Sequence, residues 1–205
     1  RYDRVGGLLI YGIPGFKLEK PIVERRAELL RQGGVAFELG ADIGGAGAAL
    51  GFAELRRRHD AVLIATGVYK ARALAAPGVG QDGVVAALDY LTASNRKGLG
   101  DSVPAFDAGT LDARGKHVVV VGGGDTAMDC VRTAVRQGAT SVSCLYRRDR
   151  ANMPGSAREV GHAEEEGVEF VWLAAPEAFL GDGRVRAARA YRMRLGAPDA
   201  TGRQT

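Results

Sequence analysis

Four valines followed by three glycines, in the stretch VVVVGGGDTAMD (residues 118–129), constrain the fold of this chain more than any other feature. Consecutive β-branched residues favour a strand, and three glycines remove the side chains that would otherwise hold a local structure together. A helical pattern follows and is closed by Gly138. We therefore expect a strand, a tight turn and the start of a helix, where something approaches the backbone closely.

The sequence around this turn predicts a βαβ unit of parallel strands. Strands are expected at 117–121, 140–148 and 168–173, with helices at 125–138 and within 156–167. Before this unit we expect a helix that begins at Pro21, a strand at 35–40, a helix at 52–59 and a buried strand at 61–67. Residues 70–116 read as a loop-rich connection with a short helix near 86–95, and the chain stops within an expected strand at 184–195. Because it also starts at Arg1, we interpret it as an internal piece of a longer protein.

Gly122, Gly124 and Ala127 fit the G-x-G-x-x-G/A fingerprint of dinucleotide-binding folds. In such a fold the missing side chains make room for a pyrophosphate at the helix N-terminus, where N–H groups and the helix dipole attract anions. Arg147 and Arg148 stand at the end of the second strand, where a binder of NAD usually carries an acidic residue, so they favour a 2′-phosphate. The alternatives are a tight turn without a ligand and a solvated strand end.

The composition excludes several classes of function. The net charge is +4 and the basic residues are scattered, so we expect no nucleic-acid partner. No apolar run approaches the roughly 20 residues that a membrane helix needs, and no secretory signal is visible. Cys130 and Cys144 have no C-x-x-C spacing, and the three histidines are isolated, so we expect no metal site, no disulfide and a cytoplasmic location.

The string YRRDRANMPGSAREVGHAEEEGVEFVWL, together with the glycine turn, resembles the pyridine-nucleotide domain of the small (beta) subunits of bacterial NADPH-dependent glutamate synthase. The strings GGLLIYGIPGFKLEK and DAVLIATGVYKAR resemble the FAD domain of the same family. The resemblance implies an α/β fold with two Rossmann-like dinucleotide-binding domains. The NADPH domain is inserted in a split FAD domain, and both domains are incomplete here. We expect a partial FAD-binding domain at 1–75, a connecting segment at 76–114 and a partial NADPH-binding domain at 115–205.

The resemblance also implies which residues bind each cofactor. For NADPH it implies Gly122, Gly123, Gly124, Asp125 and Thr126 around the pyrophosphate, and Arg147 and Arg148 at the 2′-phosphate. For FAD it implies Leu8, Lys17, Ile43, Ala65, Thr66 and Gly67. The first FAD glycine fingerprint, the cysteine-rich cluster region and the C-terminal return to the FAD domain are absent from this sequence.

By resemblance, the function is an electron-input flavoprotein. NADPH gives hydride to FAD, and electrons leave through iron–sulfur clusters, expected only in the missing part, toward a large (alpha) subunit that makes glutamate from glutamine and 2-oxoglutarate. No acid, base or nucleophile is assigned, because the flavin carries the chemistry. Two alternatives stay open: a related NADPH–flavin oxidoreductase subunit, such as a transhydrogenase or a dihydropyrimidine dehydrogenase-like protein, and a non-catalytic nucleotide-binding fragment. We expect the isolated 205-residue piece to be inactive.

Overall fold

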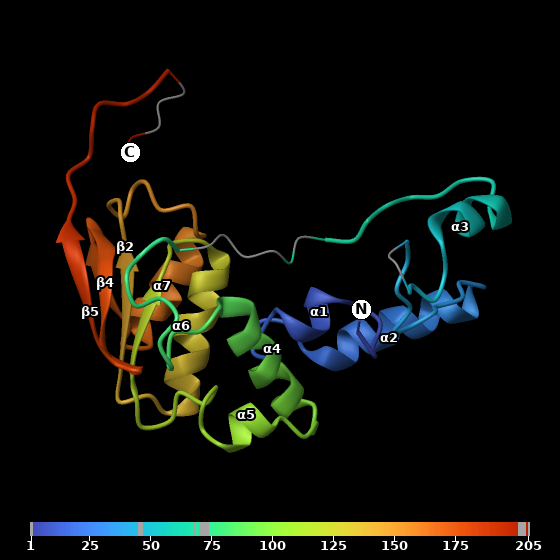
Figure 1. Ribbon diagram of the computed structural model, residues 1–205, viewed down its shortest axis with the longest axis horizontal. Helices are drawn as coiled ribbons and strands as arrows, with labels where there is room; N and C mark the ends of the chain where they lie inside the picture. The colour runs from blue at the N-terminus through green and yellow to red at the C-terminus, as the bar shows by residue number, and fades with distance from the viewer. Residues whose placement is uncertain (1, 45–46, 68, 70–73, 201–203, 205) are drawn as a thin grey trace. The chain divides into compact units, whose positions relative to one another are not determined.

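The structure is a computed structural model that describes residues 2–44, 47–67, 69, 74–200 and 204. The chain divides into two units, Arg1–Lys70 and Ala71–Thr205. The predicted βαβ motif lies in the second unit (Figure 1). In the described part of the chain, no helix has both the length and the apolar character needed to cross a bilayer.

A three-stranded parallel sheet organises the second unit. Its strands are β1 (His117–Val121), β2 (Ser141–Tyr146) and β3 (Glu169–Trp172), in the order β1-β2-β3. The connections between them run through α6 (Asp125–Gln137) and α7 (Ala157–Glu165). The prediction of strand, glycine turn, helix and strand is therefore confirmed. Gly138 ends α6 in the left-handed conformation with φ 87°, as a glycine after a helix commonly does.

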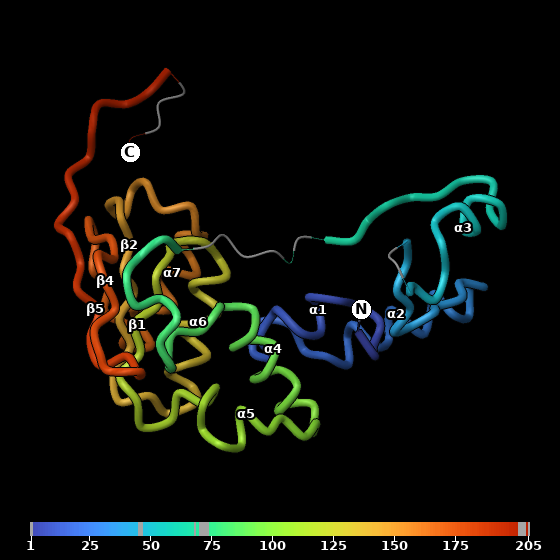
Figure 2. The backbone as a smooth tube through the Cα atoms, viewed as in Figure 1, coloured from blue at the N-terminus to red at the C-terminus, as the bar shows by residue number. Residues whose placement is uncertain are grey.

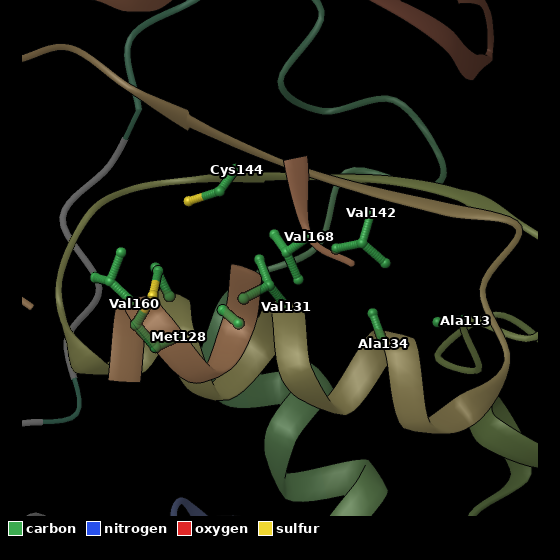
Figure 3. Close-up of a cluster of buried hydrophobic side chains, with 10 residues drawn as sticks. Ala113, Met128, Val131, Ala134, Val142, Cys144, Val160 and Val168 are labelled. Atoms are coloured by element: carbon green, nitrogen blue, oxygen red, sulfur yellow. The ribbon is translucent and has the colours of Figure 1, made fainter. Parts of the chain in front are cut away.

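The core of this unit lies between the sheet and α6. Figure 3 shows Val142 and Cys144 on the face of β2 that is turned toward Met128 and Val131 of α6. The cluster is completed by small side chains of α6 and α7 and by two residues of the adjoining loops: Ala127, Ala134, Val160, Ala163, Ala113 and Val168. Small residues on both helices let them approach each other and the strands closely.

The segment before β1 is fastened to α6 through one glutamine. It contains α4 (Ala87–Gly98), which was predicted, and α5 (Pro104–Asp107), which was not. The Gln137 side-chain oxygen accepts hydrogen bonds from the Tyr90 hydroxyl at 2.8 Å and the Ala113 N–H at 2.9 Å. Its amide nitrogen donates to Ser94 Oγ at 3.0 Å. One half-buried amide therefore holds α4 and the loop before β1 against the end of α6.

After β3 the chain forms an antiparallel hairpin of β4 (Ala174–Asp182) and β5 (Arg184–Arg192). The strand expected at 184–195 is thus observed, and its partner β4 was missed. Residues 77–82, which we call the clamp segment, are bonded to this hairpin. The Phe179 N–H donates to Pro77 O at 2.8 Å, and Gln81 Nε2 donates to Phe179 O at 2.8 Å. The Asp82 N–H donates to Gly183 O at 3.0 Å.

The first unit is helical. Its elements are α1 (Leu8–Tyr11), α2 (Lys20–Gln32) and α3 (Phe52–Arg58). Pro21 lies in the first turn of α2 and Gly33 follows its end, as the sequence predicted. The helix expected at 52–59 is confirmed by α3.

Two strand predictions in the first unit are wrong. Residues 35–40 and 61–67 form no strand, and Figure 2 shows the latter as an extended trace. Leu63 is 90% exposed and Ile64 is 69% exposed, so the expected burial is wrong as well. A strand requires a neighbour for its backbone groups. The described residues of this unit provide only one isolated bridge, between Ile43 and Leu50.

Candidate functional site

The three glycines of the turn between β1 and α6 have three different reasons to be glycine. Gly122 has φ 145°, a conformation that side chains disfavour, and its N–H donates to Leu145 O at 3.0 Å. At Gly123, a Cβ would overlap the ring of Tyr146 on β2. The first two glycines are therefore explained by the protein itself, through the turn and through contact with β2.

Gly124 is different, because a Cβ at this position would meet no protein atom within 4 Å. Its φ of −94° and ψ of 176° are extended backbone that any residue adopts. It is also the N-cap of α6, and no side chain caps this helix. An α-helix leaves its first N–H groups without intrahelical partners, here those of the exposed residues Asp125 and Thr126. Open space beside an uncapped helix N-terminus fits a pyrophosphate.

The carboxylate of Asp125 is held to one side of this space. Its Oδ1 accepts a hydrogen bond from the N–H of Ser156 at 3.1 Å. The group that Asp125 offers to a phosphate is therefore its backbone N–H and not its charged side chain. Ser156 is the N-cap of α7, although its side chain makes no capping hydrogen bond.

The arginines after β2 are not equivalent. Arg147 is exposed, whereas Arg148 is only 8% exposed. The Nε–H of Arg148 donates to the Tyr146 hydroxyl at 2.9 Å, its guanidinium carbon lies 5.6 Å from the centre of that ring, and its Nη1 lies 3.5 Å from Gln204 O. Arg150, two residues further along the chain, is exposed and forms a two-point ion pair with Glu164 of α7.

Residues 149–156 form a loop that sequence reasoning did not foresee as part of the site. Asp149 Oδ1 accepts hydrogen bonds from the backbone N–H of Asn152 at 2.9 Å and from its side-chain amide at 2.8 Å. The Tyr146 hydroxyl donates to Asn152 O at 2.9 Å, and the N–H of Gly155 donates to Gly123 O at 2.8 Å. The sequence signal for this loop is the string YRRDRANMPGS.

The six residues that the resemblance implies for FAD all lie in the first unit. Leu8 begins α1, Lys17 is an exposed turn residue, and Ile43 forms the bridge to Leu50. Residues 65–67 continue the exposed extended segment. Their FAD role stays a prediction.

The cysteines are buried in the core of the second unit. Burial raises the pKa of the Cys130 thiol to about 12 and that of the Cys144 thiol to about 12. Cys144 Sγ lies 3.2 Å from Gly122 O, so this small side chain fills the space under the glycine turn. Both thiols are free. Among the described residues there is no group of three histidine, cysteine or acidic side chains that could hold a metal ion.

Comparisons with known proteins agree with this geometry. The sequence pattern described as pyridine nucleotide-disulphide oxidoreductase matches residues 29–196. The glutamate synthase [NADPH] small chain of Azospirillum brasilense is 66% identical over 209 residues, and that of Halomonas elongata is 48% identical over 204 residues. All of this chain is covered in both alignments, but it spans only 42% of each of these curated relatives.

A solved structure supports the fold. The oxidoreductase FprA of Mycobacterium tuberculosis, solved in complex with NADPH, superposes with a TM-score of 0.75 at 18% identity, over 97% of this chain and 57% of that one. The predicted α/β, Rossmann-like fold class is confirmed. The resemblance to glutamate synthase small subunits is confirmed along the whole chain as well. The chain belongs to the pyridine nucleotide-disulphide oxidoreductases, and within them it is similar throughout its length to the small chain of NADPH-dependent glutamate synthase.

Proposed function

We propose that this chain binds NADPH at the glycine turn and that the whole protein passes hydride from NADPH to FAD. The observation that carries the proposal is the empty space at Gly124, beside the uncapped N-terminus of α6. A tight turn without a ligand would need glycine at positions 122 and 123 but has no need of it at 124. A pyrophosphate that approaches the backbone supplies the missing reason.

The 2′-phosphate is proposed to lie beside Arg147 and Arg148, at the carboxyl end of β2. In a Rossmann-like sheet, ligands bind outside the carboxyl ends of the strands, and an arginine after the second strand accommodates the extra phosphate of NADPH. The exposed Arg147 supplies a charge that is accessible from solvent. Arg148 supplies a second charge from a buried, hydrogen-bonded position. This arrangement favours NADPH over NADH.

Bound nicotinamide would supply a hydride, and the residues of this chain would hold and orient the nucleotide. The N–H groups of Asp125 and Thr126 would meet the pyrophosphate, and the two arginines would fix the adenosine end. The six FAD positions, Leu8, Lys17, Ile43, Ala65, Thr66 and Gly67, are proposed to contribute to a flavin site in the whole protein. We keep 1–75 as its partial FAD domain, 76–114 as the connection and 115–205 as the NADPH domain.

For the whole protein, the high identity to glutamate synthase small chains supports a more specific proposal. Electrons would leave the flavin through iron–sulfur clusters held outside these 205 residues. The acceptor would be a large subunit that makes glutamate from glutamine and 2-oxoglutarate, in the cytoplasm. The similarity to glutamate synthase small chains supports the proposal of a large-subunit partner.

Two measurements, made one after the other, test the proposal. Calorimetric titration of the purified chain with NADP⁺ and with NAD⁺ should give tighter binding of NADP⁺. Equal affinities, or no binding of either nucleotide, would contradict the nucleotide proposal. The whole protein, mixed with a large subunit of glutamate synthase, should then oxidise NADPH only when glutamine and 2-oxoglutarate are both present. NADPH oxidation that ignores these two substrates would favour a related flavin oxidoreductase.

A further inference from the structure

One aromatic side chain contacts both the glycine turn and Arg148 in the proposed NADPH site. Tyr146 is the last residue of β2 and is only 6% exposed. Its ring occupies the space that a side chain at Gly123 would need. Its hydroxyl accepts a hydrogen bond from Arg148 Nε at 2.9 Å and donates one to Asn152 O at 2.9 Å. The ring also meets Trp172 of β3 edge-on, with 6.4 Å between ring centres.

We propose that Tyr146 is a positioning residue that sets the preference for NADPH by holding Arg148. The inference rests on the proposed NADPH function of this site and identifies what gives the site its specificity. Arg147 and Arg148 are adjacent in sequence, yet only Arg148 is anchored by a hydroxyl and stacked near a ring. The anchored arginine is the one whose geometry is fixed before a phosphate arrives.

The physical argument concerns the entropy of a long side chain. An arginine loses the rotamer freedom of its long side chain when it is fixed in place, which is an entropic cost. If the free protein has already fixed it, less of this cost falls on nucleotide binding. The Tyr146 hydroxyl occupies the Nε–H of Arg148, so the donors that remain for a phosphate are those of the terminal nitrogens, of which Nη1 also lies 3.5 Å from Gln204 O.

The ring of Tyr146 has a second role at the pyrophosphate end of the site. It lies against Gly123, and Gly123 O accepts the N–H of Gly155 at 2.8 Å. The loop 149–156 therefore joins the turn to the same tyrosine whose hydroxyl holds Arg148. Tyr146 therefore separates the two phosphate subsites by a fixed distance. Its ring sets the conformation of the glycine turn, and its hydroxyl sets the position of the Arg148 side chain.

These two roles can be separated by mutation. Tyr146→Phe keeps the ring against Gly123 and removes only the hydroxyl. The dissociation constant for NADP⁺ should then rise by about three- to tenfold, the effect of losing one hydrogen bond, while that for NAD⁺ changes by less than about twofold. A residue with a merely structural role would weaken both nucleotides equally. In an Arg148→Ala background, Tyr146→Phe should add no further loss of NADP⁺ affinity.

The matched control is Tyr90→Phe. Tyr90 is in the same unit, and its hydroxyl makes a hydrogen bond of 2.8 Å to Gln137 at the other end of α6. This variant should leave the ratio of NADP⁺ to NAD⁺ affinity unchanged. If Tyr146→Phe fails to fold, Arg148→Lys is tested in its place. Lysine keeps the positive charge but lacks the guanidinium Nε–H that donates to the Tyr146 hydroxyl. The Arg148→Lys variant should lose most of the preference for NADP⁺ over NAD⁺.

Each outcome decides between the two proposals. A wild-type protein without preference for NADP⁺ overturns the proposed function, and the inference on Tyr146 falls with it. A wild-type preference that survives unchanged in Tyr146→Phe overturns the inference alone. Equal weakening of both nucleotides, additive losses in the Arg148→Ala background, or full preference in Arg148→Lys overturn it too.

Discussion

The N–H of Gly155 donates a hydrogen bond of 2.8 Å to the carbonyl oxygen of Gly123, 32 positions earlier in the chain. This bond joins the loop after β2 to the middle of the glycine turn after β1. The strands that precede these two segments, β1 and β2, are neighbours in the same parallel sheet. The pyrophosphate side and the 2′-phosphate side of the proposed site are therefore parts of one hydrogen-bonded structure. The effects of substitutions on nucleotide binding and on stability are predicted for each side in turn.

Removal of both arginines should remove most of the preference for NADPH. Each charge-assisted contact contributes about 1.5–3 kcal/mol, so Arg147→Ala with Arg148→Ala should reduce the preference at least about tenfold. Fluorescence or calorimetric titration with NADPH and NADH measures the ratio. Arg158→Ala, at an exposed residue of α7, serves as a control for the loss of a surface arginine. Unchanged relative affinities in the double variant would refute the assignment.

Substitution at Gly124 should affect the ligand and spare the fold. A Cβ there meets no protein atom within 4 Å, so Gly124→Ala should fold normally and bind NADP⁺ at least about tenfold more weakly. Gly123→Ala should instead lower the free energy of unfolding by about 1–3 kcal/mol, because its Cβ overlaps Tyr146.

The control for Gly124→Ala is Gly161→Ala in the middle of α7, where the Cβ also meets nothing within 4 Å. It should leave nucleotide binding unchanged and stabilise the protein by up to about 1 kcal/mol, since alanine is the better helix former. If Gly124→Ala binds NADP⁺ as tightly as the wild type does, the open space is not the pyrophosphate site.

Arg132 should contribute far more to stability than Arg136, although both donate to the same oxygen of Glu166 at 2.7 Å. The Arg132 side chain is 9% exposed and also binds Glu159 at 2.8 Å, whereas that of Arg136 is 45% exposed. Arg132→Ala should cost about 3–5 kcal/mol, since it removes a buried guanidinium that pairs with both Glu159 and Glu166. Arg136→Ala should cost less than about 1 kcal/mol in urea unfolding. Similar losses in the two variants would contradict this account of the α6–α7 contact.

The two cysteines should be unreactive in the folded protein. With a pKa of about 12 for each thiol, roughly one molecule in ten thousand carries the thiolate at pH 8. A thiol-exchange dye should therefore label no cysteine in the native chain and two after unfolding in urea. Rapid labelling of the native chain, or iron that is lost on Cys144→Ser, would show that these thiols are not core residues.

The isolated 205-residue chain should bind NADP⁺ and should not retain FAD through gel filtration. The second unit has a glycine turn between a strand and a helix N-terminus. Within the described residues of the first unit, no helix follows a strand in this way. Absorbance at the flavin bands after gel filtration, with calorimetry for NADP⁺, checks both parts. A stoichiometric yellow protein would show that the first unit holds the flavin without such a turn.

The second unit could be predicted from the sequence because its signals are local. Four valines, three glycines and Gly138 determine a strand, a turn and a helix end within 22 residues. The first unit misled the same reasoning, since residues 61–67 have the composition of a buried strand. Whether such a segment pairs depends on a neighbouring strand, which the composition of seven residues does not encode.

At the site, residue types were predictable and their roles were not. Arg147 and Arg148 are identical in type, and only the three-dimensional position of Tyr146 makes one of them buried and anchored. The same tyrosine explains Gly123, which the fingerprint treats as a variable position. Strand β4 was missed because Pro176 and two irregularities in its register obscure the alternation of a strand.

The clamp segment also has a consequence for synthesis of the chain on the ribosome. Gln81 reaches Phe179, its hydrogen-bond partner, across 98 positions of sequence. At about 5–20 residues per second, residues 77–82 leave the ribosome roughly 5–20 seconds before the hairpin that they bind. During that interval their backbone groups are without their final partners. The parallel sheet and its helices can form during this interval. The β4–β5 hairpin, with its hydrogen bonds to residues 77–82, is then the last part of the unit to form.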